Sequence, residues 1–117
     1  MAEHRITLTW DKGVVPFTYE SYPRNHAIAF KDGQETVIAS ASPAYKGDAA
    51  KADPEDMLVA ALSSCHMLSF LAIASKKKLT VNSYQDHAVG FLEPLQAVWH
   101  DAIVTPVGSW PRTRSSR

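Results

Sequence analysis

Apolar and polar side chains alternate in short runs along the N-terminal third of the chain, as they do in half-buried strands. Segment 5–10, RITLTW, places its apolar residues on one face. Segment 14–20, VVPFTYE, is expected to be a second extended piece, in which Pro16 favours an edge or a bulge. The runs HAIAF and ETVIAS then flank the pair Asp32-Gly33, which is a strong hairpin signal. This region is therefore predicted to consist of antiparallel strands.

A long apolar segment at 53–75, DPEDMLVAALSSCHMLSFLAIAS, has a different pattern. Asp53 suits the N-cap of a helix and Pro54 its first position, while Glu55 and Asp56 place carboxylates in the positively polarised first turn. Beyond that turn, apolar residues occur on every side, so protein should cover most of this helix. The following segment, VNSYQDHAVGFLE, returns to the character of a strand.

These elements predict one α+β domain over residues 1–117, with N-terminal antiparallel strands, a long buried central helix and further strands. A chain of 117 residues, 45% of them hydrophobic, is long enough to build a core. Residues 94–117 contain one plausible strand and then turn polar and proline-containing. They are expected to form an atypical tail.

Charge and composition narrow the function classes. The sequence has 12 basic and 12 acidic side chains, so a general attraction to nucleic acid is not expected. No uninterrupted apolar run reaches the roughly 18 to 20 residues that span a bilayer, and the start of the chain lacks a secretory leader pattern. We therefore expect no membrane association and a cytoplasmic location, where the single cysteine would be a free thiol.

That cysteine, Cys65, lies in the middle of the long helix. The simplest interpretation is a small apolar residue that packs in the core. A metal site is disfavoured because the one cysteine and the five histidines are scattered without the close Cys or His pairs that zinc sites usually show, and no cofactor is expected. A cysteine–histidine hydrolase is also disfavoured, because its nucleophile usually lies between a strand and a helix and Cys65 does not. The role of the adjacent His66 stays open, since neighbouring helix residues point about 100° apart.

Several segments resemble, in order and spacing, the OsmC/Ohr family of thiol peroxidases. The helix opens with Pro54-Glu55 and carries Cys65 ten residues after the glutamate. The upstream segments YPRNHAIAF and SASPAYKGD, and VNSYQDHAVGFLE downstream, resemble the strands and the loop around the family's central helix. The resemblance covers roughly residues 5–93 and is closest to the OsmC-like branch with SSCHM on the helix.

The resemblance implies that the thiolate of Cys65 attacks the O–O bond of a small organic hydroperoxide. An ordinary cysteine has a pKa near 8.5 and supplies little thiolate at neutral pH, so a cation must stand beside the sulfur. By resemblance that cation is Arg24, oriented by Glu55. The second cysteine that the family usually carries in a later helix is absent, and the chain ends about where that helix is expected. An external thiol or dithiol would then have to reduce the oxidised cysteine.

Helix geometry adds a constraint on this predicted site. Ten residues rise about 15 Å and leave their side chains about 80° apart, so Glu55 cannot touch Cys65 on one straight helix. Either the helix is kinked between them, or Glu55 and Arg24 come from a neighbouring subunit. A helix that is apolar all round also needs more cover than one chain of this size supplies. Both features favour an intertwined homodimer with two sites at its interface, as the resemblance also implies.

Three functions remain open. The first is an OsmC-like protein that reduces organic hydroperoxides through its reactive cysteine in oxidative stress defence. The second is a non-catalytic or redox-sensing protein of the same fold, whose Cys65 oxidises once. The third is a module that binds a small hydrophobic ligand in an apolar pocket. Candidate pocket residues are Met57, Leu58, Leu62, Met67, Leu68, Phe70, Tyr22, Phe30 and Tyr45.

Overall fold

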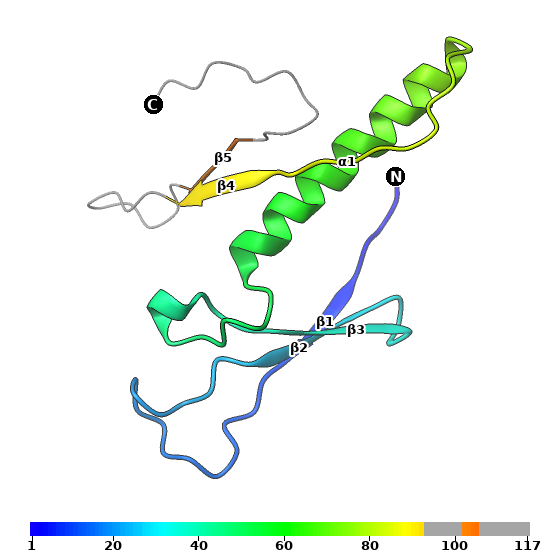
Figure 1. Cartoon of the computed structure of the whole chain (residues 1–117). Helices are drawn as coiled ribbons and strands as arrows, with labels where there is room; N and C mark the ends of the chain where they lie inside the picture. Colours follow the sequence, from blue (N-terminus) through cyan, green and yellow to red (C-terminus); the bar gives the residue numbers. More distant parts are fainter. Residues whose placement is uncertain (93–101, 106–117) are drawn as a thin grey trace. The chain divides into compact units, whose positions relative to one another are not determined.

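The computed structural model describes residues 1–92 and the backbone of 102–105. In chain order the elements are β1 (Ile6–Thr9), β2 (His26–Phe30), β3 (Glu35–Ala39), the short 3-10 helix η1 (Pro43–Tyr45), α1 (Pro54–Lys76), β4 (Val89–Leu92) and β5 (Ala102–Thr105) (Figure 1). They form two compact units, Met1–Pro54 and Glu55–Arg117, each with its own sheet. The predicted α+β class is confirmed.

The N-terminal unit is built on a three-stranded antiparallel sheet with β2 in the middle. β2 and β3 form the predicted hairpin, closed by a turn in which the Gly33 amide donates to the Phe30 carbonyl. Asp32 and Gly33 both have positive φ, +54° and +88°, which aspartate tolerates and glycine adopts freely. Ile28 at the centre of β2 and Ala39 at the end of β3 are the buried apolar residues of this sheet.

The expected extended piece at 14–20 is not a strand. Between β1 and β2 the chain forms turns, fixed by amides of Ser21 and Tyr22 that both donate to the Thr18 carbonyl. The aromatic side chains of this loop pack on one another instead of alternating along an extended backbone, with the Phe17 and Tyr22 ring centroids 5.3 Å apart. Local side-chain clustering therefore decided the conformation that alternation alone predicted wrongly.

After β3, the chain folds back on itself before the long helix. Ser40 is completely buried: its amide donates to the Ala52 carbonyl, and its hydroxyl accepts the Asp48 amide at 3.0 Å. Gly47 passes so close to the backbone of Ala41 that a Cβ on it would lie 1.7 Å from the Ala41 carbonyl oxygen. This loop thus closes through backbone contacts that leave no room for a side chain at its tightest point.

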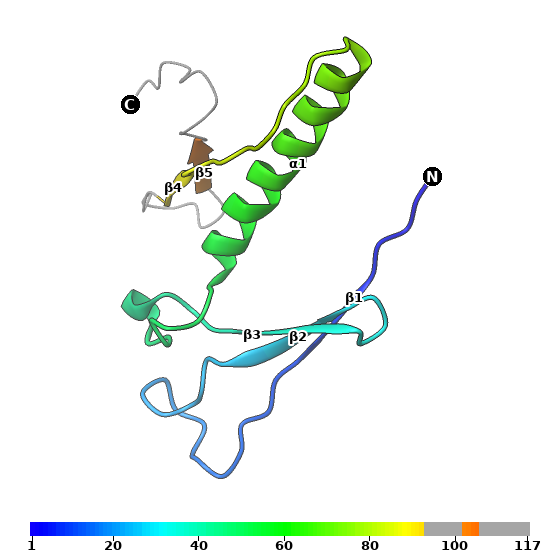
Figure 2. The same ribbon diagram turned by 45° about the vertical axis from the view of Figure 1, so that its right-hand side comes forward.

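In the C-terminal unit, α1 is α-helical at every residue from Pro54 to Lys76 (Figure 2). Glu55 and Asp56 lie in its first turn, as predicted. The helix ends where Lys78 adopts a left-handed conformation, φ +63°, and the Leu79 amide donates to the Ala74 carbonyl. This hydrogen bond and the one from Lys78 to Ser75 form a Schellman motif, which satisfies carbonyls at the helix end.

β4 and β5 pair antiparallel, with Val89 opposite Thr105 and Leu92 opposite Ala102. They correspond to the later strands expected from the sequence. β4 is shorter than the expected strand segment, because residues 79–88 have no regular secondary structure. Of the predicted atypical tail, residues 94–117, all but 102–105 lie outside the described part of the chain.

Within the single chain α1 is almost uncovered, and Ala74 is its one buried residue. Five of its large apolar side chains are 42% to 59% exposed: Leu58, Leu62, Leu68, Phe70 and Ile73. The predicted burial of the central helix is therefore not met within one chain. It stays a prediction that requires a further covering surface.

α1 is also long and apolar enough to cross a membrane, judged by length and composition alone. The expectation that no segment meets this requirement was wrong. That expectation considered only uninterrupted apolar runs. Beyond its first turn α1 contains four polar residues, Ser63, Ser64, His66 and Ser69, but its mean hydropathy is still high enough for a membrane-spanning helix. The core helix of a soluble protein passes the same test.

Candidate functional site

Cys65 is exposed, about halfway along α1. Residues three and four positions away share its face of the helix. Two of these, Leu62 and Leu68, are large apolar side chains that are 43% and 59% exposed. The thiol therefore lies on a face of the helix that is both apolar and accessible in the single chain.

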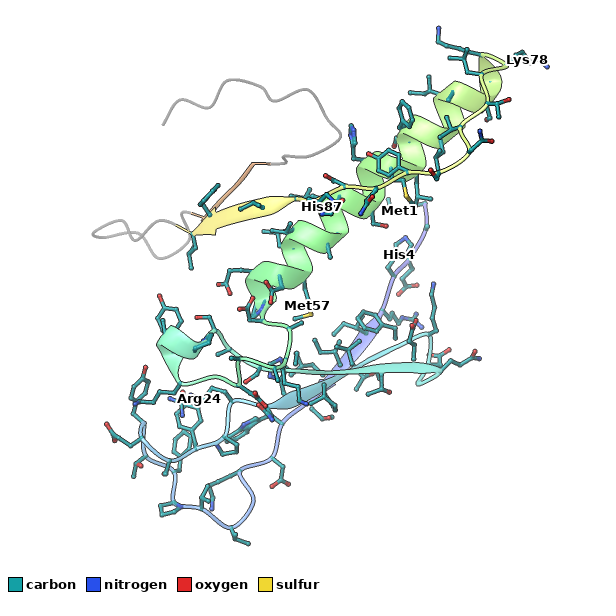
Figure 3. The ribbon with its side chains drawn as sticks, in the orientation of Figure 1. Met1, His4, Arg24, Met57, Lys78 and His87 are labelled. Carbon is teal, nitrogen blue, oxygen red and sulfur yellow. The ribbon has the colours of Figure 1, made fainter. Side chains whose placement is uncertain are left out.

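Arg24 lies in the N-terminal unit, in the loop that precedes β2 (Figure 3). Its Nη1 donates to the Tyr22 carbonyl at 2.5 Å and its Nη2 to the Tyr19 carbonyl at 2.8 Å. The guanidinium carbon is 3.6 Å from the centre of the Tyr22 ring and 4.7 Å from that of Tyr19. The predicted cation is thus held by its own loop in a defined orientation.

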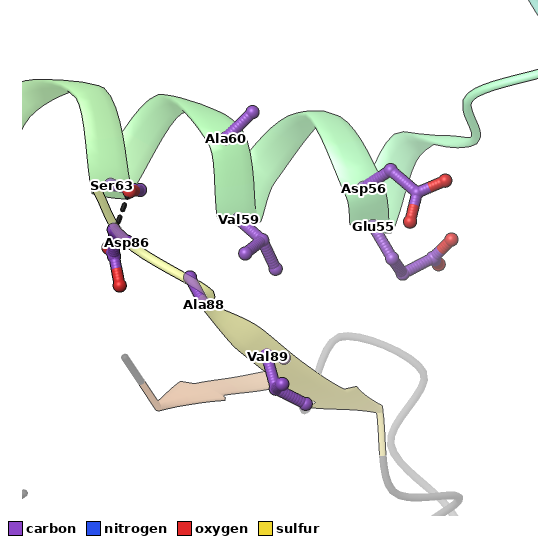
Figure 4. Close-up of a pocket in the computed structure, with 9 residues that line it drawn as sticks. Glu55, Asp56, Val59, Ala60, Ser63, Asp86, Ala88 and Val89 are labelled. Atoms are coloured by element: carbon purple, nitrogen blue, oxygen red, sulfur yellow. Dashed lines mark hydrogen bonds between the residues drawn. The ribbon is translucent and has the colours of Figure 1, made fainter. Parts of the chain in front are cut away.

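Glu55 lies at the start of α1 and borders a groove of about 470 Å³ within the C-terminal unit (Figure 4). The helix contributes acidic, apolar and hydroxyl side chains to one side of this groove, and the segment leading into β4 lines the other. The lining residues are Glu55, Asp56, Val59, Ala60, Ser63, Asp86, Ala88, Val89 and Gly90.

A short hydrogen bond ties the two sides of this groove together. The Ser63 hydroxyl donates to Oδ2 of Asp86 at 2.6 Å, which fastens the otherwise irregular segment before β4 to the helix. The other carboxylate oxygen of Asp86, Oδ1, is buried and has no hydrogen-bond partner among the described residues. Sequence reasoning did not find this contact, since a serine and an aspartate 23 positions apart carry no local signal.

The unbroken helix excludes one of the two alternatives left by its geometry, a kink between Glu55 and Cys65. Since α1 has no kink between Glu55 and Cys65, these two residues of one chain are separated by a rise of about 15 Å and cannot be in contact. Side chains on a helix also tilt toward its N-terminus, which directs Glu55 away from Cys65. Arg24 belongs to the other unit, and its approach to Cys65 stays a prediction.

The described residues contain no group of three or more histidine, cysteine, aspartate and glutamate side chains that could hold a metal ion. His66 makes an interaction of its own in the structure.

Comparison with known proteins identifies the family. The model of the family described as OsmC-like protein matches residues 47–103. A solved OsmC-like protein of unknown function from Vibrio cholerae is 38% identical, with a TM-score of 0.76, over 98% of this chain and 80% of that one. The chain belongs to the OsmC-like family. A search of curated proteins gave no match.

The two comparisons cover different candidate residues. The segment matched by the OsmC-like family model contains Glu55 and Cys65, whereas Arg24 lies upstream of it and is covered by the likeness to the Vibrio cholerae structure.

Proposed function

We propose that this OsmC-like protein reduces small organic hydroperoxides, with Cys65 as the nucleophile, and that it serves in oxidative stress defence. The observation that carries the proposal is the position of the chain's only thiol. Cys65 is accessible on an apolar face midway along the long helix of an OsmC-like chain.

The reaction begins with the thiolate of Cys65. Its sulfur attacks the terminal oxygen of the hydroperoxide, an S–O bond forms as the O–O bond breaks, and the alkoxide leaves with the bonding electron pair. Protonation of the alkoxide gives the alcohol. The sulfur, oxidised by two electrons, is then a sulfenic acid.

Arg24 would stabilise the thiolate and the developing alkoxide, because a guanidinium stays charged and donates several hydrogen bonds in fixed directions. Glu55 would pair with Arg24 and orient it. Since Glu55 and Cys65 of one helix cannot meet, a complete site takes Cys65 from one chain and Glu55 with Arg24 from another. We therefore propose an intertwined homodimer with two sites at its interface.

The apolar surroundings of the thiol support the substrate class. Leu62 and Leu68 share the helix face of Cys65, and their exposed surface would be covered by an alkyl or aryl group of the substrate. Each methylene removed from water contributes about 0.8 kcal/mol, so organic hydroperoxides would bind better than hydrogen peroxide. No nucleic acid, membrane or cofactor has a role in this proposal.

Recycling requires a second reactant. The chain's 117 residues include one cysteine, so a small thiol or a dithiol protein must attack the sulfenic acid, release water and then reduce the mixed disulfide. A cytoplasmic location would supply such reductants. The single cysteine also favours one alternative function, a redox-sensing protein in which Cys65 oxidises once and is not recycled. A binding module without thiol chemistry is the remaining alternative.

The test is a sulfenic-acid trap. The full chain is mixed with one equivalent of cumene hydroperoxide and a dimedone-type probe, and intact mass is read within seconds. Fast adduct formation at Cys65, slowed at least about tenfold in Arg24→Ala and only partly restored in Arg24→Lys, supports the proposal. Equal slow rates in all three proteins would contradict it. Sustained turnover with a dithiol separates the peroxidase from the single-use sensor.

A further inference from the structure

The loop between β1 and β2, residues 10–25, is long for a connection without regular structure, and its only predicted reactive residue is Arg24. A loop of this length samples many conformations unless its own side chains restrict it. Here two hydrogen bonds from Arg24 to the Tyr19 and Tyr22 carbonyls fix the guanidinium relative to the backbone. They use two of its five N–H groups and leave three to bind other acceptors.

The Tyr22 ring supports the guanidinium from one face. A separation of 3.6 Å between the guanidinium carbon and the ring centre is a stacked cation–π contact, closer than the 4.7 Å contact with Tyr19. The two hydrogen bonds to carbonyl groups would by themselves allow the guanidinium plane to change its tilt. The contact with the Tyr22 ring restricts that tilt. Tyr22 therefore controls the direction in which the remaining N–H groups of Arg24 point.

Tyr22 is itself held by the other aromatic residues of the loop. Its ring centroid lies 5.3 Å from Phe17, 6.1 Å from Trp10 and 6.3 Å from Tyr19. Trp10 also donates from its indole Nε1 to the Pro23 carbonyl at 2.8 Å, next to Arg24 in the chain. Because Trp10 directly follows β1, a continuous set of contacts runs from the sheet through Trp10 and Tyr22 to Arg24.

Burial explains little of this aromatic cluster, because Tyr22 at its centre is half-buried and the three rings around it are exposed. Phe17 is 68%, Tyr19 53% and Trp10 43% exposed. Rings that remain in solvent contribute little to a hydrophobic core. Two of the rings, Tyr22 and Tyr19, instead contact the Arg24 guanidinium, and Tyr19 also lies 5.7 Å from Lys46 Nζ.

We infer that Tyr22 and Trp10 are positioning residues for Arg24: they hold its guanidinium in the orientation from which it acts on Cys65. This inference rests on the proposed function. Tyr22 supplies the stacked ring, and Trp10 anchors both that ring and the Pro23 carbonyl to the end of β1. Neither side chain touches the reacting atoms.

The test compares rates of Cys65 sulfenic-acid formation across variants of the full chain. Tyr22→Leu is expected to slow the reaction roughly tenfold, Trp10→Phe roughly threefold, and Tyr22→Phe, which keeps the ring, less than about twofold. Val14→Ser is the matched control, because Val14 is fully exposed in the same loop and should leave the rate unchanged.

A double-mutant cycle shows whether Tyr22 acts through Arg24. In an Arg24→Ala background, Tyr22→Leu should have no further effect on the rate, whereas a merely structural role would slow the reaction by the same factor in both backgrounds. A second readout needs no activity: the ring-current shift of the Arg24 Nε–H signal in NMR should disappear in Tyr22→Leu and persist in Tyr22→Phe.

The outcomes separate the two claims. If Arg24→Ala slows the reaction but Tyr22→Leu and Trp10→Phe do not, the positioning inference is wrong and the proposed function stands. An additive double mutant also overturns the inference. If Arg24→Ala itself has no effect, the proposed role of Arg24 fails and the positioning role fails with it, even where the NMR signal confirms the stacking.

Discussion

The loop that carries Arg24 and the helix that carries Cys65 achieve order in different ways. The loop has no regular secondary structure, yet Arg24 is fixed by two carbonyls and a stacked ring. The helix is regular over 23 residues, yet many of its apolar side chains are exposed and Ala74 is its one buried residue. The contacts within the loop are enough to orient Arg24. The helix has its backbone hydrogen bonds formed, but much of its apolar surface is uncovered.

This difference is one that the proposed homodimer would resolve. A preorganised cation requires only that a thiolate be brought to it. An uncovered apolar helix with an accessible thiol requires a surface that excludes water and supplies charge. The two regions therefore have complementary requirements, which the proposed homodimer would meet.

The largest effect is expected at the thiol. Cys65→Ser should lower the rate of hydroperoxide consumption on the order of a thousandfold or more, because no other group in the chain replaces the sulfur nucleophile. Peroxide consumption with a dithiol reductant measures it. Ser64→Ala is the neighbouring control and should retain the wild-type rate. Residual activity of Cys65→Ser within about tenfold of wild type would mean that the accessible thiol is incidental.

The next largest effect is expected at Gly47, in the loop of the N-terminal unit that closes through backbone contacts. Gly47→Ala should lower the free energy of unfolding by roughly 3 kcal/mol, because the added Cβ meets the backbone of Ala41, which cannot swing aside. Urea unfolding measures the change. Gly33→Ala is the control: its φ of +88° strains an alanine by about 1 kcal/mol, but the added Cβ meets no atom within 4 Å. A smaller loss for Gly47→Ala than for Gly33→Ala would contradict this.

A third prediction concerns the uncovered helix. Leu62→Lys should weaken self-association roughly a hundredfold, because burying an unpaired ammonium at an apolar interface costs about 2 to 3 kcal/mol. Sedimentation at several concentrations measures the effect. Val14→Lys changes an exposed apolar residue of the N-terminal loop in the same way and should leave association intact. A wild-type protein that is monomeric throughout would rule out the dimer itself.

The smallest expected effect is at the tie between α1 and the segment before β4. Ser63→Ala should cost about 1 to 2 kcal/mol of stability, because the hydroxyl donates at 2.6 Å to a carboxylate that would lose its partner. Ser64→Ala, on an exposed neighbour, should change stability by a few tenths of a kcal/mol. Thermal unfolding of the two variants in parallel measures the difference. Equal melting temperatures would show that the hydrogen bond contributes nothing net.

Sequence patterns predicted the parts of the fold that depend on local chemistry. Asp32-Gly33 marked the hairpin because the turn needs positive φ, and Pro54 with its acidic neighbours marked the start of α1. The extended piece at 14–20 was predicted wrongly, since alternation cannot reveal that Phe17 and Tyr22 pack on each other.

The candidate site could be predicted only in part from the sequence. Cys65, Arg24 and Glu55 were identified by resemblance, but nothing in spacing showed that Tyr22 stacks on Arg24 or that Ser63 bonds Asp86. The closely spaced aromatic residues before Arg24 were the one available signal of the cluster around the guanidinium. Contacts between side chains distant in sequence depend on tertiary packing, which a local pattern does not encode.

One complementation measurement tests the shared site directly. Cys65→Ser and Arg24→Ala chains, each nearly inactive alone, are unfolded together, refolded as an equal mixture and assayed for hydroperoxide reduction. If the site combines Cys65 of one chain with Arg24 of another, half the dimers are mixed and each regains one of two sites, so about a quarter of wild-type activity returns. A mixture no more active than the average of the two variants would show that the thiol and the cation do not meet across chains.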